Sequence, residues 1–105
     1  MSERMVKYKP MLTTLSRCSP GMARRLIKPG EDDFILALFD AVWTTLAGKV
    51  DLLPEQLDKI RSVQSVLRRF ADRGQSVDER RRVLLWKRNG VRAVQILLRA
   101  IRKQF

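Results

Sequence analysis

The sequence contains no histidine and a single cysteine, Cys18. Without histidine the chain lacks the usual general base near neutral pH and the commonest metal ligand in proteins. One cysteine cannot form a disulfide within the chain, and it cannot supply the ligand set of a structural zinc site. We therefore expect no catalytic residues, no metal and no cofactor, and we predict that the protein is not an enzyme.

Long apolar runs are also missing. No stretch reaches the roughly 18 apolar residues that a helix needs to span a bilayer. The N-terminus has no uninterrupted apolar core behind its charged residues, so the sequence does not predict a secretory signal. We expect a location in the cytoplasm or nucleus and no secretion. The 105 residues, 45% of them hydrophobic, are enough for one domain with one core.

Positive charge is in excess, with 22 lysines and arginines against 11 acidic residues and a net charge of +11. Residues 1–30 carry +6, residues 31–58 carry −6 and residues 59–105 carry +11. Such a surplus attracts polyanions, and nucleic acid is the commonest one because phosphate contacts release condensed counterions. Anionic lipid head groups are the second candidate. Polyanion binding is expected at the two basic ends of the chain.

Turn residues and apolar spacing predict an all-α fold, a small bundle of about four helices preceded by a flexible basic N-terminal arm. The arm, residues 1–30, is expected to be largely irregular because prolines and glycines interrupt it. Residues 31–105 are expected to form a single α-helical domain. Its helices are predicted at about 31–47, 54–73, 77–88 and 91–103, from acidic starts, a proline start and a Ser76–Glu79 capping box. The first is expected to be the central core helix because it is apolar over more than half its circumference.

Two aromatic residues of the first predicted helix are assigned to the core. Trp43 and Phe39 lie on the first predicted helix, where core packing is favoured over base stacking. Trp86 belongs to the apolar residues of the third predicted helix. The last helix has an apolar stripe at spacings of three and four, made of Val91, Val94, Leu98, Ile101 and Phe105.

Basic side chains on the last three predicted helices are the candidate phosphate contacts. Arg81, Arg88 and Arg92 share a broad helical face, on which guanidinium groups can follow a phosphate backbone. The turn before the third helix has the length of a helix-turn-helix connection, but Asp78 and Glu79 at the start of that helix repel phosphate. We therefore predict sequence-independent binding of nucleic acid, and of DNA in the first instance, in which arginines position the nucleic acid rather than read its bases. The candidate residues are Arg68, Arg69, Arg73, Arg80, Arg81, Arg82, Lys87, Arg88 and Arg92.

The acidic residues and Cys18 are weaker candidates for a functional site than the basic residues. Asp51, Glu55 and Asp58 lie at spacings of four and three on one helical face, where they could bind a cation weakly or meet the basic arm. The carboxylates that begin the first helix are explained as helix caps. Cys18 has neither a histidine nor a second cysteine as partner, so a buried or incidental thiol is the favoured interpretation.

Several short motifs carry a resemblance to a known group of proteins. They are LIKPGEDDF at 26–34, GKVDL at 48–52, LRRFAD at 67–72, Ser76 and RRRVLL at 80–85. Over residues 26–90 the chain resembles the short basic proteins of Polinton or Maverick-type elements and adintoviruses, which are encoded near adenovirus-like capsid genes. The resemblance implies a virus- or element-derived protein of the virion, host nucleus or cytoplasm, analogous to the small basic core protein mu of adenoviruses, which condenses the genome. Those proteins continue with a Gly-Gly pair and an apolar tail, whereas this chain has an arginine-bearing helix from Val91.

Two other functions are compatible with the sequence. In one, the protein is a capsid-associated interaction or oligomerisation module, whose basic surface contacts an acidic partner while the apolar stripe of the last helix mediates assembly with a capsid protein or with further copies of the chain. In the other, the last helix inserts that stripe into a membrane interface, with Trp86 near the lipid head groups. Packing of the stripe into the core is favoured over insertion.

Overall fold

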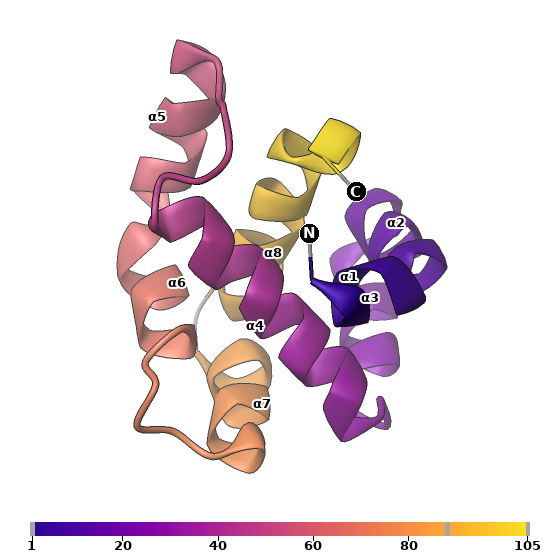
Figure 1. The fold of residues 1–105 in the computed structure, drawn as a ribbon. Coiled ribbons are helices and arrows are strands. Elements are labelled where there is room, and N and C mark those ends of the chain that lie inside the picture. Colours follow the sequence, from indigo (N-terminus) through magenta and orange to yellow (C-terminus); the bar gives the residue numbers. More distant parts are fainter. Residues whose placement is uncertain (1, 88, 105) are drawn as a thin grey trace.

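The computed structural model describes residues 2–87 and 89–104, and all regular structure within these ranges is helical (Figure 1). Arg88, a candidate phosphate contact, and Phe105, the last residue of the predicted stripe, lie outside the described residues. The all-α class is confirmed, but the described ranges contain eight short α-helices rather than about four. The elements are α1 (Glu3–Lys7), α2 (Lys9–Arg17), α3 (Pro20–Ile27), α4 (Asp32–Leu46), α5 (Pro54–Ser62), α6 (Gln64–Phe70), α7 (Val77–Trp86), α8 (Gly90–Ala100) and a 3-10 helix, η1 (Arg102–Gln104).

The first 30 residues correct the prediction of a flexible, irregular arm, because α1, α2 and α3 fill most of them. Pro10 and Pro20 do not break helices here. They occupy the first turns of α2 and α3, where a missing N–H leaves no hydrogen bond unmade. The hydroxyl of Ser19 caps α3 by accepting a 3.3 Å hydrogen bond from the N–H of Met22. The apolar residues that these helices add to the common core are Met5, Tyr8, Leu12, Leu15, Ala23 and Ile27.

The predicted helix bounds are confirmed where the signals are local. α4 ends before Gly48, whose φ of 75° is the left-handed conformation that terminates helices. α7 begins after Ser76, whose hydroxyl accepts a 3.2 Å hydrogen bond from the N–H of Glu79. The helix predicted from Pro54 to about residue 73 instead breaks at Val63, with φ −120° and ψ 13°. No glycine or proline marks this break, and both pieces contact α8, so tertiary packing sets it.

α8, not α4, is the central helix. It contacts every helix from α2 to α7, and Figure 1 shows it behind α4, with α1–α3 on one side and α5–α7 on the other. α4 is apolar but lies across one face of the molecule, where it contacts α1, α6, α7 and α8. Most apolar residues of α8 are buried, as is Ile101 directly after it; the buried residues are Val91, Ala93, Val94, Leu97, Leu98 and Ile101.

This packing agrees with the prediction that the stripe of the last helix packs into the core. Val91, Val94, Leu98 and Ile101, its described residues, are buried and are not exposed for the two alternatives, assembly and insertion into lipid. Within the described residues no helix combines the length and the apolar character needed to cross a membrane.

Candidate functional site

Arg80 lies inside the molecule, which corrects its place among the candidate phosphate contacts. The residue is 6% exposed. Its Nε donates a 3.3 Å hydrogen bond to the carbonyl of Phe70 and an Nη donates a 2.9 Å hydrogen bond to that of Asp72, while the guanidinium lies 4.0 Å from the ring centroid of Phe39. Burial lowers the pKa of Arg80, against the opposing effect of the nearby charges of Asp72 and Glu79. The side chain thus satisfies carbonyls at the end of α6 rather than a ligand.

Arg81 is also held by the protein. Its side chain is 16% exposed and forms a 3.0 Å ion pair with Asp32 at the start of α4. The same guanidinium donates hydrogen bonds to the carbonyls of Ile27, at 2.8 Å, and Gly30, at 2.7 Å. These contacts join α7 to the end of α3, where carbonyls lack partners within the helix. Protein groups therefore bind the guanidinium of Arg81, whereas Arg82, the next residue, is exposed to solvent.

Trp86, at the end of α7, is 83% exposed and lies outside the core. Trp43, by contrast, is half-buried and its ring is covered by the cations of Lys49 and Arg73, at 4.9 and 4.8 Å from the ring centroid. No such cation lies over Trp86 in the part of the chain that the structure describes.

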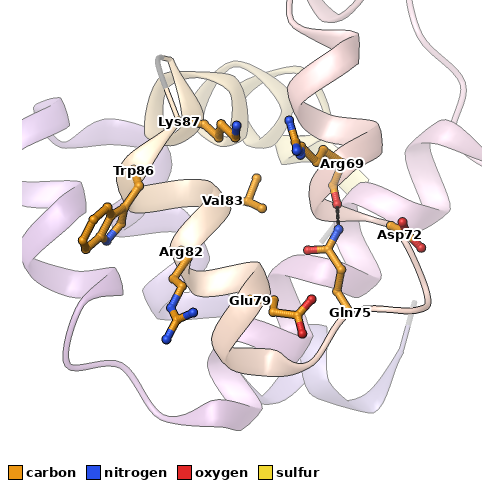
Figure 2. A pocket seen from close by; sticks show the side chains of 8 residues that line it. All are labelled: Arg69, Asp72, Gln75, Glu79, Arg82, Val83, Trp86 and Lys87. Carbon is orange, nitrogen blue, oxygen red and sulfur yellow. Dashed lines mark hydrogen bonds between the residues drawn. The ribbon is translucent and has the colours of Figure 1, made fainter.

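One hollow, of about 510 Å³, lies between α6 and α7 on one side of Trp86. Figure 2 shows Arg69 of α6 facing Val83 and Lys87 across it, with Trp86 projecting away from the axis of α7. Its basic residues are Arg69, Arg82 and Lys87, accompanied by two carboxylates, those of Asp72 and Glu79. The side-chain amide of Gln75 donates to the carbonyl of Arg69.

A second hollow, of about 540 Å³, lies on the other side of Trp86, between α3 and α7. Arg24 and Arg25 of α3 and Lys28, directly after it, line this hollow together with Leu85, and no carboxylate does. Arg24 is held in place by a 2.7 Å hydrogen bond from its guanidinium to the carbonyl of Leu85. Arg25 and Lys28 are exposed.

Two further hollows extend the same surface. One shares Arg24 and Lys87 with the hollows beside Trp86 and adds Arg92, and the next shares Arg92 and adds Lys59 and Arg99. Because neighbouring hollows share residues, their basic side chains are continuous. We call this region the basic surface, and it consists of Trp86 with Arg24, Arg25, Lys28, Lys59, Arg69, Arg82, Lys87, Arg92 and Arg99.

The structure therefore gathers part of the predicted set. Of the candidates, Arg69, Arg82, Lys87 and Arg92 lie on the basic surface. Arg68 and Arg73 are exposed but line none of its four hollows.

The sequence predicts polyanion binding at the basic first 30 residues, but the named phosphate contacts include no residue of α3 or its C-cap. Arg24, Arg25 and Lys28 follow the Ser19-Pro20 pair, which is a helix start, and a helix from Pro20 places residues 24 and 28 on one face. That signal was present in the sequence, but the prolines and glycines of the first 30 residues were interpreted as loop signals.

The two basic residues of α1 have acidic partners. Arg4 lies 3.7 Å from Asp40 and 4.0 Å from Asp33, and Lys7 lies 3.6 Å from Asp33, so α1 neutralises part of the acidic face of α4. Asp51, Glu55 and Asp58 do not meet α1 in this way. Among the described residues no cluster of three or more acidic or cysteine side chains is arranged to hold a metal ion.

The chain matches no known protein family, and neither curated proteins nor solved structures show a significant similarity to it.

Proposed function

We propose that this protein binds nucleic acid, and DNA in the first instance, through the phosphate backbone and without sequence preference. The observation that carries the proposal is the continuity of the basic surface over four adjoining hollows, three of which contain no carboxylate. A further hollow, which shares Arg25, is mostly apolar and includes Glu31. Cations gathered in this way raise the local potential and can neutralise successive phosphates.

The lack of a base-reading helix supports sequence independence. The start of α7 carries the exposed carboxylates of Asp78 and Glu79, which repel a phosphate backbone and keep this end out of a groove. The exposed cations lie on several short helices instead, an arrangement that suits contacts with phosphates rather than with base edges.

Residues 26–90 resemble short basic proteins of Polinton-type elements and adintoviruses. This resemblance supports a role in which the protein binds and condenses the DNA of a virus or mobile element. The surplus of +11 fits such a role, because condensation requires neutralisation of many phosphates per protein.

The test compares two variants of equal charge. In the first, Arg25, Arg82 and Lys87 of the basic surface are replaced by alanine. In the second, the exposed Lys9, Arg17 and Lys103, which line none of its hollows, are replaced by alanine. None of these six side chains has an ion pair or hydrogen bond to another described residue, so both variants should fold. Mobility-shift titrations of a DNA duplex at several salt concentrations give the affinity and its salt dependence.

We expect wild-type affinity to fall steeply between roughly 50 and 200 mM salt. In the basic-surface variant the slope of log affinity against log salt should decrease by about 0.9 for each phosphate contact removed, and in the control variant it should change little. Equal weakening of the two variants would contradict a localised interface. Binding that does not depend on salt would exclude the proposal altogether.

A further inference from the structure

The exposure of Trp86 has no structural explanation within the described protein. Tryptophan buries more apolar area than any other side chain when it packs, and its exposure forgoes that gain. Among the described residues, Trp86 is nevertheless the most exposed of the large apolar side chains, at 83% against 61% for Val6, the next highest. It lies at the last position of α7, and the neighbouring residues Val83 and Leu84 supply the buried contacts of that helix.

Cations flank the indole on both sides. Arg82 lies one helical turn before Trp86 and therefore on the same face of α7, and Lys87 follows directly. On the other side, Arg25 of α3 and Lys28, directly after that helix, line the second hollow, which Trp86 also lines. The described cations that stack on aromatic rings are directed at Tyr8, Phe39 and Trp43, which leaves the indole of Trp86 uncovered by them.

We propose that Trp86 is a stacking platform for the bases of single-stranded nucleic acid, with phosphates on its two sides bound by Arg82 and Lys87 and by Arg25 and Lys28. This inference rests on the function proposed above and names its preferred ligand. A duplex keeps its bases stacked inside the helix, so a surface indole gains little from it. An unpaired base can stack on any exposed aromatic face, and positive charge beside that face follows the backbone.

The test measures the affinity of wild type, Trp86→Ala and Trp86→Phe for an oligothymidylate and for a duplex of the same length. Because stacking on one aromatic side chain accounts for about 1–3 kcal/mol, Trp86→Ala should weaken single-strand binding roughly five- to 150-fold. It should change duplex binding little, and it should leave the salt slope unchanged because no charge is removed. Trp86→Phe should retain most of the affinity. Since the side chain is exposed, thermal melting should show that both variants remain folded.

A fluorescence arm reports on the indole itself. Trp43→Phe leaves Trp86 as the only tryptophan, and stacking with thymine should quench its emission on addition of the single strand. Vesicles of anionic phospholipid serve as the comparison. A blue shift with vesicles and no quenching by the oligonucleotide would overturn the inference in favour of a lipid surface.

The outcomes separate this inference from the function on which it rests. If duplex and single strand bind in a salt-dependent manner but Trp86→Ala leaves single-strand affinity unchanged, the stacking role is wrong and backbone binding stands. If wild type binds neither nucleic acid, both are wrong.

Discussion

Arg80, Arg81 and Arg82 carry the same guanidinium on successive residues of α7, but each residue turns the helix by about 100°, so the three point in different directions. Arg80 turns into the core, Arg81 turns towards Asp32 and the end of α3, and Arg82 turns to solvent. Replacement of all three together would combine a loss of stability with a loss of surface charge. Their roles can be separated only by single substitutions.

Tyr8 has the largest shift in pKa that the structure indicates. Its hydroxyl donates a 2.8 Å hydrogen bond to a carboxylate oxygen of Glu31, and this bond, assisted by burial and by the charges of Glu31 and Asp33, raises the pKa of Tyr8 from 10.0 to about 12. Because the pKa of Tyr8 is higher in the folded than in the unfolded state, protonated Tyr8 stabilises the fold fully below about pH 10. This stabilisation is lost as the pH rises towards 12. The free energy of unfolding should therefore fall across this window, and it should fall less steeply in Tyr8→Phe.

Absorbance of the phenolate measures the ionisation directly, because Tyr8 is the only tyrosine. The midpoint should lie near pH 12 in the wild type and lower in Glu31→Gln, which lacks the negative charge. A wild-type midpoint near 10, with the fold intact by circular dichroism, would show that the hydrogen bond to Glu31 does not form in solution.

At the scale of elements, several basic and polar side chains satisfy the carbonyls at the ends of neighbouring helices. Short helices have many such carbonyls, because the last four of each helix lack a partner within it, and cations also interact favourably with the negative end of the helix dipole. Gln95 of α8, 1% exposed, donates hydrogen bonds to the carbonyls of Leu15 and Cys18 at 3.0 and 2.8 Å, and Arg99 donates to that of Ser16 at 2.6 Å. Part of the positive charge is therefore structural, which a count of charges does not reveal.

The connection between α7 and α8 depends on a glycine. Gly90 begins α8, and a Cβ at this position would collide with the carbonyl oxygens of Val83 and Leu84 near the end of α7. Gly90→Ala should therefore reduce the free energy of unfolding by about 1–3 kcal/mol, as overpacking of a tight contact does. Urea denaturation followed by circular dichroism measures the change.

Gly21 of α3 is the matched control, because a Cβ there would meet nothing within 4 Å. Gly21→Ala should leave stability unchanged or raise it by up to about 1 kcal/mol, since alanine has the higher helix propensity. Equal effects of the two substitutions would show that α7 and α8 do not approach each other closely in solution.

At the scale of the whole molecule, a net charge of +11 is held within extents of 33 × 29 × 27 Å. Among the described residues, the lysines and arginines within 4 Å of a carboxylate are Arg4, Lys7, Arg61 and Arg81. Most of the described lysines and arginines therefore have no carboxylate within 4 Å, and their charges repel one another. The screening length decreases from about 30 Å at 0.01 M salt to about 8 Å at 0.15 M, so salt removes most of this repulsion across the molecule.

The melting temperature should consequently rise with salt over this range, by about 4–8 °C for each kcal/mol of repulsion removed. Differential scanning calorimetry at several salt concentrations measures it. The variant that lacks Arg25, Arg82 and Lys87 should show a smaller rise, because its net charge is lower. A melting temperature that falls with salt would indicate that the ion pairs of α1 and α4 outweigh the repulsion.

The sequence by itself determined the features that depend on neighbouring residues. The all-α class, the end of α4 before Gly48, the start of α7 after Ser76 and the surplus of basic residues all follow from caps, turn residues and composition, which act within about one helical turn. The helices of the first 30 residues also had local signals, in Pro10 and Pro20, but the same residues are typical of loops. Local sequence alone did not distinguish a helix start from a loop at these prolines.

Only the tertiary structure decided which side chains are buried. The break at Val63, the central position of α8, the burial of Arg80 and the exposure of Trp86 depend on contacts between residues far apart in the chain. Arg80 and Arg82 have the same chemistry, and whether a guanidinium meets a carbonyl or a phosphate depends on what packs beside it. Trp86 is exposed while Val83 and Leu84 of the same helix are buried, and this difference depends on which residues of α7 the other helices cover.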